Sequence, residues 1–286
     1  MNSTYFRANT PDVQDLPWEY PVADWHKHCS RLEEVPRGPS RHPVVFVNYS
    51  GTLYAIKELP PGLAKQEYEL LVKMEEGRLP CVTPTGYDER DTPHGRSSYL
   101  FTRYLEGSLP YRSLFMRSNL DRYRDTLLDA MAGLLVQLHL AGIFWGDCSL
   151  SNTLFRRDAG ALQAYLVDAE TAELHPAHLS PVLRHHDLEI MLENIEGDLI
   201  DLEALGHLPP NFPVCETGEH ILARYRLLWE EISREQVINP DERYRIQEQI
   251  RALNALGFSV RDVEIQNSQQ GGMLRPRFVI TGRNFH

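Results

Sequence analysis

One stretch, residues 138–168, constrains what this chain can fold into more than any other part of the sequence. Apolar residues at helical spacing lead up to Gly142, where the helix is expected to end and a loop to begin. The loop carries Asp147 and, five residues later, Asn152. Two polar side chains with oxygen atoms therefore lie in one short loop directly after a buried helix.

The residues after this loop predict a β-hairpin. Residues 153–155 and 164–167 are apolar runs on either side of a turn that contains Gly160, and the second run leads directly into Asp168. A hairpin brings the start of its first strand next to the end of its second strand. Asn152 and Asp168 are therefore expected side by side.

Strand patterns come first in the rest of the chain, and helix patterns come later. Short apolar, β-branched runs predict strands, whereas apolar residues three or four positions apart predict helices. The expected strands are residues 44–47, 53–56 and 99–102, and the expected helices are residues 63–76, a helix through 127–138 and several between 185 and 255. Such segregation predicts an α+β fold with a strand-rich N-lobe and a helical C-lobe.

The predicted organisation has four parts. An N-terminal arm with a short helix takes residues 1–30, the N-lobe residues 31–106, the helical C-lobe residues 107–257, and a small α/β extension residues 258–286. The first 17 residues are expected to be a loose arm, and the extension is expected to hold two strands. An unpaired edge strand in the extension would offer a pairing surface to a second copy of the chain, giving a homo-oligomer.

Composition narrows the classes of function. The chain has 286 residues, enough for two lobes, and a formal net charge of −11, which disfavours nucleic acid as its main partner. No apolar run reaches the length of a membrane span, and the N-terminus has no signal-peptide pattern, so a cytoplasmic protein is expected. The scattered cysteines Cys29, Cys81, Cys148 and Cys215 predict neither a disulfide framework nor a zinc site.

The residues of the loop and hairpin suit phosphoryl transfer. That reaction needs a carboxylate to accept a hydroxyl proton, oxygen ligands for Mg²⁺, and a cation that holds the phosphates. Asp147, Asn152 and Asp168 supply the carboxylate and the oxygen ligands. Because their order and spacing place them together, the sequence predicts a site for ATP and Mg²⁺.

The stretch Leu138 to Asn152 resembles the catalytic loop of protein kinases, with an L-H-x-x-G-I lead-in and a D-x-x-x-x-N core. The resemblance implies that Asp147 is the catalytic base and that Asn152 and Asp168 bind the metal. The phrases W-G-D-C-S-L-S-N-T-L-F and L-V-D-A-E-T-A-E are most similar to a bacterial kinase-like family grouped with the lipopolysaccharide (Kdo/WaaP) kinases. This similarity extends from about residue 30 to about residue 257.

The chain departs from well-studied protein kinases in three places. Trp145-Gly146 replaces His-Arg, Ser149 replaces the usual Lys, and Glu170 replaces the Gly of D-F-G. An activation-loop switch of the usual type is therefore not expected.

Lys57 is the predicted phosphate-binding cation. It ends the strand Tyr54-Ala55-Ile56-Lys57, which resembles the V-A-I-K of the third kinase strand, and the resemblance implies catalytic contacts with the α- and β-phosphates. Among the glutamates of the following helix, Glu67 falls on the apolar face. An inward-facing carboxylate needs a cation, so Glu67 is the predicted partner of Lys57.

Two further segments are candidates for nucleotide contacts. The loop before residue 44 has no G-x-G-x-x-G pattern, but Arg37 and Arg41 there would hold phosphate by charge, unless they belong to a solvated turn. Tyr104 lies in a segment that resembles the hinge that contacts adenine, where backbone atoms would make the contacts.

Three other polar groups are interpreted as structural. His139 is expected to brace the end of its helix, Cys148 to be packed rather than reactive, and Asp187 to brace the catalytic loop from a later helix. A zinc site is not expected, because prolines interrupt the segment that carries His175, His178, His185 and His186.

Two hypotheses of function follow. The first is an ATP- and Mg²⁺-dependent phosphotransferase similar to lipopolysaccharide kinases, whose acceptor is a sugar, a small metabolite or a protein hydroxyl. The second is a pseudokinase, a nucleotide-binding regulatory or scaffolding module without efficient transfer. The missing glycine-rich loop, Ser149 and Glu170 favour the second; turnover of ATP discriminates the two.

Overall fold

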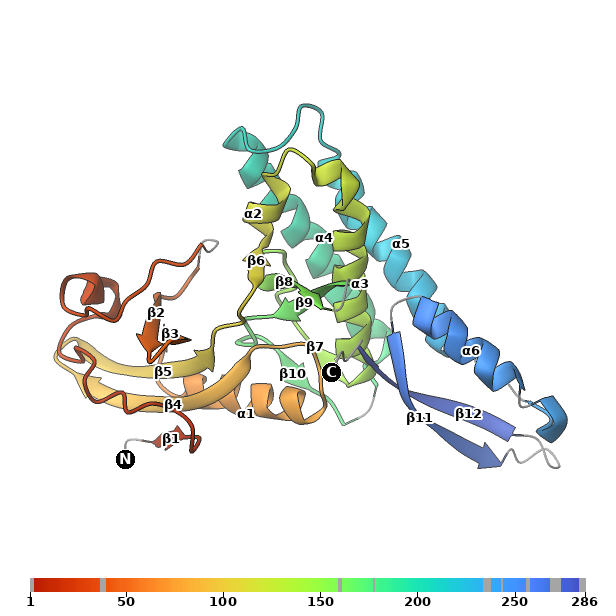
Figure 1. Ribbon diagram of the computed structural model, residues 1–286, viewed down its shortest axis with the longest axis horizontal. Coiled ribbons are helices and arrows are strands. Elements are labelled where there is room, and N and C mark those ends of the chain that lie inside the picture. Colours follow the sequence, from red (N-terminus) through yellow and green to blue (C-terminus); the bar gives the residue numbers. More distant parts are fainter. Residues whose placement is uncertain are drawn as a thin grey trace.

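The computed structural model describes residues 3–36, 40–158, 161–176, 178–233, 238–242, 244–255, 258–267 and 274–282. A strand-rich lobe, a helical lobe and a C-terminal helix with a hairpin follow one another across the molecule (Figure 1). The predicted segregation of strands and helices is therefore present.

The N-lobe is built on a five-stranded antiparallel sheet in the order β1-β4-β5-β3-β2. Its strands are β1 (Thr4–Phe6), β2 (Val44–Tyr49), β3 (Thr52–Leu59), β4 (Thr83–Thr92) and β5 (Gly95–Arg103). The predicted hairpin is β2 with β3, whose turn places Ser50 and Gly51 at positive φ. Strand β4 was not predicted, because its sequence is rich in Pro, Gly and charged residues.

Helix α1 (Leu63–Glu76) covers one face of this sheet, over the residues predicted for it. It begins after Gly62, whose φ of +87° suits glycine. Ala64, Leu71 and Met74 form its buried apolar face. The same face carries Glu67, so the helix delivers one carboxylate into the interior.

The N-terminal segment covers the other face of the sheet. Its 3₁₀ helix η1 (Val22–Lys27) buries Trp25 against Trp18, and Trp18 meets Tyr99 of β5 edge to face at 5.0 Å. The prediction of a loose arm over residues 1–17 was wrong at β1, which pairs with β4. Gly86 of β4 permits this pairing, because a Cβ there would lie 2.3 Å from the ring of Phe6.

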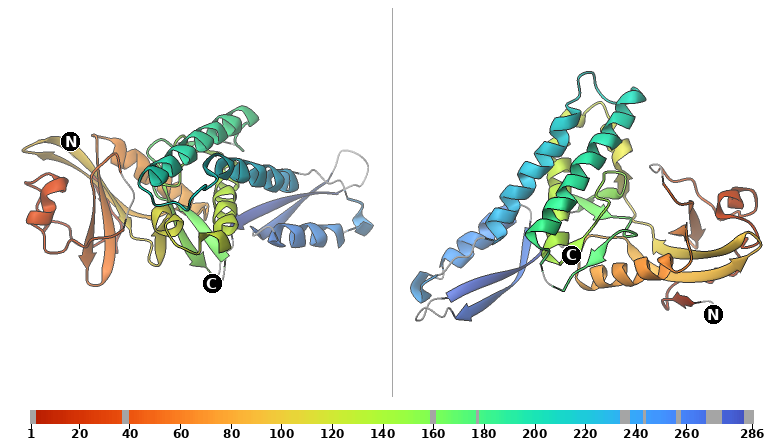
Figure 2. Two further views of the ribbon diagram at one scale, coloured as in Figure 1. Left: turned by 90° about the horizontal axis from the view of Figure 1, so that it is seen from above. Right: turned by 180° about the vertical axis from the view of Figure 1, so that it is seen from behind.

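The C-lobe is a group of helices packed around a central one. Its elements are α2 (Tyr111–Phe115), η2 (Leu120–Arg122), α3 (Arg124–Leu140), α4 (Pro181–Ala204) and α5 (Val214–Ser233). Helix α3 is buried over most of its length and packs on α5 (Figure 2). Small sheets complete the lobe: β6 (Ser108–Pro110), β8 (Thr153–Asp158) and β9 (Ala161–Leu166) form one, and β7 (Ile143–Phe144) pairs with β10 (Glu173–Leu174).

The C-terminal part extends away from the N-lobe, beyond the far end of α5 (Figure 1). It consists of η3 (Pro240–Glu242), α6 (Tyr244–Ala255) and the antiparallel pair β11 (Phe258–Asn267) and β12 (Leu274–Gly282). The two strands expected in the extension are β11 and β12. Homo-oligomer formation through this hairpin stays a prediction.

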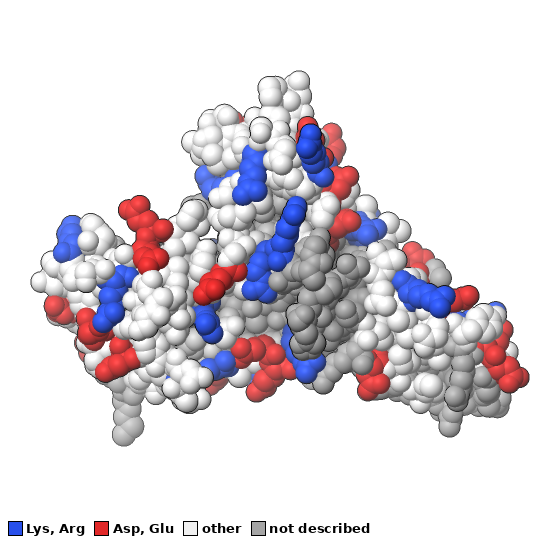
Figure 3. Space-filling view, viewed as in Figure 1, with Lys and Arg blue, Asp and Glu red and all other residues white. Residues whose placement is uncertain are grey.

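Charge and hydropathy bear on the predicted partners. On the face seen in Figure 3, acidic and basic side chains are intermixed over both lobes. Among the described helices, none is both long and apolar enough to cross a lipid bilayer.

Candidate active site

The loop that carries Asp147 begins with a backbone turn that strongly favours glycine. Gly146 has a φ of +75°, and a Cβ there would lie 3.0 Å from the carbonyl oxygen of Thr171. Thr171 Oγ1 donates a 2.9 Å hydrogen bond to the carbonyl oxygen of Trp145, so the loop packs tightly on the chain after Asp168. This close approach explains the glycine at position 146, where protein kinases have Arg.

Asp187 of α4 anchors the same loop through hydrogen bonds. Its carboxylate is fully buried and accepts hydrogen bonds from the backbone amides of Trp145 and Gly146, both at 2.8 Å, and from the Cys148 thiol at 3.1 Å. Oδ2, the oxygen that accepts from the Trp145 amide, also lies 3.0 Å from His139 Nε2. The hypothesis that Asp187 braces the loop from a helix is borne out by these contacts.

The protonation states follow from burial. Burial lowers the pKa of the His139 imidazole, against the effect of Asp187, and the other ring nitrogen contacts the Tyr225 hydroxyl at 2.8 Å. Burial alone would raise the pKa of Asp187, but its hydrogen bonds with His139 and the two amides lower it. Burial also raises the pKa of the Cys148 thiol well above its ordinary value, as expected for a packed cysteine.

Two side-chain amides orient Asp147. Asn152 Nδ2 donates to Asp147 Oδ2 at 3.0 Å and to its carbonyl oxygen at 3.1 Å, while Asn194 of α4 donates to Oδ1 at 2.9 Å. Ser149 is buried, and its hydroxyl accepts a hydrogen bond from the Asn152 amide at 3.1 Å. The residue at the place of the usual Lys thus supports the loop.

The hairpin of β8 and β9 returns the chain to this loop. Thr153 pairs with Leu166, and the Val167 amide donates to the Asn152 carbonyl oxygen at 3.1 Å. The buried indole of Trp145 then donates to the carbonyl oxygen of Asp168 at 3.1 Å. Asp147, Asn152 and Asp168 consequently line one cavity.

Lys57 reaches this site from the N-lobe. Its Nζ lies 2.8 Å from Asp168 Oδ2, 3.2 Å from Glu67 Oε2 and 3.3 Å from Glu170 Oε2. Glu67 also accepts a 3.0 Å hydrogen bond from the Ala169 amide through its other oxygen. Of the glutamates on α1, Glu67 is therefore the one that joins the helix to both Lys57 and the segment after β9.

The ion pairs in this cluster are strongly desolvated. Burial alone would lower the pKa of Lys57, but the charges of Glu67 and Asp168 raise it. Burial raises the pKa of Glu67 to about 7, against the effect of Lys57. A buried carboxylate beside a single lysine that it shares with two other carboxylates accepts a proton more readily than an exposed one.

Glu170 connects the two lobes, a role that the sequence did not predict. Its carboxylate contacts Lys57 and also lies 3.1 Å from Nε2 of His42, which precedes β2. The unusual glutamate of D-A-E, Glu170, was the one sequence feature that indicated a contact at this position. No sequence feature indicated His42 as its partner.

Two adjoining cavities meet at these residues. The first, of about 130 Å³, has a mainly apolar lining from both lobes and includes Lys57, Tyr104 and Asp168. The second, of about 330 Å³, is polar and includes Asp147 and Asp168. The Tyr104 amide donates to the Leu53 carbonyl oxygen at 2.9 Å, so this N–H is already engaged within the lobe.

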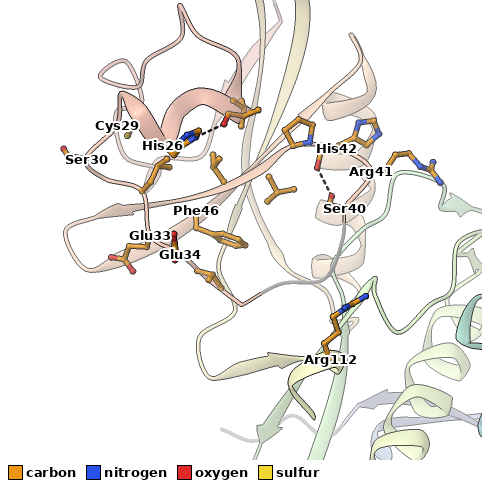
Figure 4. A pocket seen from close by; sticks show the side chains of 17 residues that line it. His26, Cys29, Ser30, Glu33, Glu34, Ser40, Arg41, His42, Phe46 and Arg112 are labelled. Atoms are coloured by element: carbon orange, nitrogen blue, oxygen red, sulfur yellow. Dashed lines mark hydrogen bonds between the residues drawn. The ribbon is translucent and has the colours of Figure 1, made fainter. Parts of the chain in front are cut away.

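The segment before β2 stands at the entrance to both cavities. Ser40 lines each of them, and Arg41 lines the polar one, whereas Arg37 lies outside the described residues. A larger open cavity of about 1190 Å³ also borders this segment. Arg112 of α2 is one of the residues that line this larger cavity (Figure 4). Arg41 is exposed, so its side chain reaches the cavity from its rim.

Asn194 and Asp198 are site residues that sequence reasoning missed. Asp198 accepts hydrogen bonds from the Ser151 amide at 3.0 Å and from the Tyr111 hydroxyl at 3.2 Å, so it supports the loop next to Asn152. Asp187, Asn194 and Asp198 share one side of α4 with its buried apolar residues. Polar residues that recur on the apolar face of a predicted helix were the signal that would have found them.

Among the described residues there is no group of three or more His, Cys, Asp or Glu side chains arranged to hold a metal ion. This includes the four histidines of the segment considered for zinc, His175, His178, His185 and His186. The structure places His185 and His186 beside Glu189 on the surface of α4.

The chain belongs to the lipopolysaccharide kinase (Kdo/WaaP) family, whose sequence model matches residues 50–204, more than half of the chain. A second model, a domain of unknown function (DUF4032), matches residues 227–286. No curated protein matches the sequence.

Solved structures with the same fold include WaaP in complex with acyl carrier protein, at 16% identity and a TM-score of 0.51, covering 89% of this chain and 99% of that one. An aminoglycoside-3'-phosphotransferase of type VIII matches at 17% identity and a TM-score of 0.49, covering 76% of this chain and 92% of that one. The predicted two-lobed, protein-kinase-like α+β fold is confirmed. Family membership places the chain among phosphotransferases.

Proposed function

We propose that the protein is an ATP- and Mg²⁺-dependent phosphotransferase in which Asp147 is the catalytic base. One observation carries the proposal: Lys57 of the N-lobe meets Asp168 of the C-lobe at 2.8 Å, at the border of the cavity that contains Asp147 and Asn152. A phosphate-binding cation, oxygen ligands and a carboxylate base are the groups that phosphoryl transfer requires.

The two cavities suit the two ends of ATP. The apolar cavity would hold the adenine against Leu100, Leu154 and the Tyr104 backbone. Lys57 would bind the α- and β-phosphates, with Glu67 fixing its position. Arg41 at the rim would add positive charge beside the γ-phosphate.

The residues present fit a magnesium ion. Mg²⁺ prefers oxygen ligands and is commonly held by one or two protein groups together with substrate phosphates. Asn152 uses its amide nitrogen for both hydrogen bonds to Asp147, so its amide oxygen is the atom left for the metal. The Asp168 carboxylate lines the same cavity. When bound there, Mg²⁺ would neutralise phosphate charge.

Asp147 would accept the proton of the acceptor hydroxyl. Asn152 and Asn194 hold one carboxylate oxygen each, which orients the group without protonating it. The acceptor oxygen would then attack the γ-phosphorus, the bond from the γ-phosphorus to the bridging oxygen would break, and ADP would leave.

A second candidate is a nucleotide-binding regulator without efficient transfer. The contact between Glu170 and Lys57 favours it, because this carboxylate occupies a cation that the phosphates need. Glu170 stands where protein kinases have the Gly of D-F-G, so a glutamate that competes with phosphate for Lys57 is a feature of this sequence.

ATP turnover separates these candidates. The full chain with ATP and MgCl₂ is expected to release ADP, and the release is expected to stop with a chelator or with Asp168→Asn. The exposed Asp121→Asn is the matched control and is expected to behave as wild type. Magnesium-dependent ATP binding with no ADP release would favour the regulator, and no nucleotide binding at all would exclude both.

A further inference from the structure

The position of the acceptor follows from that of the base. A hydroxyl must come within about 3 Å of the Asp147 carboxylate to transfer its proton. Asp147 faces the polar cavity of about 330 Å³, and helix α4 supplies one wall of that cavity through Glu193, Asn194, Gly197, Asp198 and Asp201. Asn194 on this wall donates to Asp147 itself, so α4 is part of the catalytic site and not a distant surface.

The wall of α4 is one helix face with an opening in its middle. Its five residues recur at the spacing that places side chains on one side of a helix. Gly197 is the central one, and a Cβ built there would have no atom within 4 Å. A glycine inside a 24-residue helix weakens the helix, and here it leaves the cavity open where a side chain would enter it.

The charges on this wall are not neutralised. Asp198 is occupied with the Ser151 amide and the Tyr111 hydroxyl. Glu193 and Asp201 are exposed, and neither has an ion-pair partner among the side chains in the described part of the chain. Six carboxylates line the cavity in all, whereas Arg41 is the one Lys or Arg among its described lining residues. An anionic acceptor would meet this wall with repulsion, and a cationic one with attraction.

We propose, on the basis of the proposed function, that Glu193, Gly197 and Asp201 form the acceptor-binding wall and that the acceptor is a compact hydroxyl compound with a protonated amine. The hydroxyl faces Asp147 and the ammonium group faces Glu193 and Asp201. The cavity volume suits a small molecule. The hydroxyl proton passes to Asp147, and the acceptor oxygen takes the γ-phosphoryl group from ATP.

Charge-matched acceptors test the class. Two sets are compared on the full chain with MgATP: glucosamine, glucose and glucuronate, and ethanolamine, ethylene glycol and glycolate. ADP release above the water background is expected to rank amine over neutral over acid. The amine should exceed the acid in kcat/KM by about tenfold or more, as for one uncompensated charge pair.

Variants of α4 test the wall. The double variant Glu193→Gln/Asp201→Asn is expected to reduce the ratio of kcat/KM for the amine to kcat/KM for the acid at least about fivefold. The reason is that the amine binds more weakly, with a higher KM, once the charges at the rim are removed. Glu203→Gln, which removes an exposed acid of the same helix outside the cavity, is the control and is expected to keep the preference. Gly197→Leu is expected to fold, with thermal unfolding as the check, and to raise the KM of every acceptor.

The outcomes separate this inference from the proposed function. A preference for the acid member, or an amine preference that survives the double variant, would overturn the acceptor wall. Stimulation by none of the six compounds, with Asp168-dependent ADP release intact, would overturn the acceptor class and leave the phosphotransferase standing. No ADP release from wild type would remove the proposed function itself.

Discussion

The loop around Asp147 and the segment Ser40–Pro43 face the same cleft from opposite lobes, yet they are held in different ways. The loop is anchored by Asp187, Asn194 and Asp198, all on one helix and all hydrogen-bonded to it. The segment is largely exposed, and it contacts the opposite lobe through His42, whose Nε2 lies 3.1 Å from the Glu170 carboxylate. The C-lobe half of the site is thus preorganised, whereas in the N-lobe half a nucleotide must compete for existing ion pairs.

The largest effect is expected from Asp187→Ala. Two buried backbone amides and His139 would lose their acceptor, which lowers the free energy of unfolding by about 3–5 kcal/mol. Denaturant unfolding measures this, with the exposed Asp121→Ala as a control expected to stay within about 0.5 kcal/mol of wild type. A loss below about 1 kcal/mol would contradict a preorganised loop.

The Lys57 cluster predicts a pH dependence. Burial raises the pKa of Glu67 to about 7 in the folded protein. The folded state therefore binds this proton more tightly than the unfolded state does. The contribution of Glu67 to stability is present below pH 4.5 and is lost as pH rises through about 7.

Glu67→Gln removes this titration. The stability of wild type relative to Glu67→Gln is expected to fall between pH 4.5 and about 7, as followed by denaturant unfolding at each pH. Glu69→Gln, at an exposed position of the same helix, is expected to show no such trend relative to wild type. If the free energy of unfolding of wild type relative to Glu67→Gln instead rises across this pH range, Lys57 lowers the pKa of Glu67 below its ordinary value.

A smaller effect is expected from Glu170→Gln. Without its charge, Lys57 is freer to bind phosphate, so the affinity for MgATP is expected to rise about threefold to tenfold. Equilibrium binding measures it, and Glu173→Gln, an exposed acid on β10, is the control. A fall in affinity that depends on magnesium would show that Glu170 supports the metal and does not compete with the nucleotide.

The smallest effect is expected from Tyr104→Phe. The Tyr104 ring packs on Phe46 at 5.7 Å, and the variant keeps that contact and the backbone. The Kd for MgATP is expected to change less than about twofold, since the variant removes one hydroxyl and leaves the ring and the backbone in place. A tenfold loss would instead assign the hydroxyl a direct role in nucleotide binding.

The comparison of the two regions also explains what could be predicted from sequence. Local periodicity and residue spacing are sufficient to predict three features of the structure. These are the helix over residues 63–76, the hairpin of β8 and β9, and the loop with Asp147 and Asn152. Strand β4 could not be predicted, because its buried Asp88 and Glu89 depend on Thr4, Arg90 and Arg96. The role of His42 likewise depends on a contact between segments far apart in the chain. For Asn194 and Asp198, the apolar face of α4 marks the positions, but their partners Asp147, Ser151 and Tyr111 follow only from the tertiary fold.

The most direct test of the phosphotransferase account is Asp147→Asn, measured for binding and turnover on the same preparation. The amide keeps the shape of the side chain but cannot accept the hydroxyl proton. The Kd for MgATP is expected to stay within about threefold of wild type, and ADP release to fall about 100-fold or more, the size of a lost general base. Equal ADP release by wild type and Asp147→Asn would contradict the account.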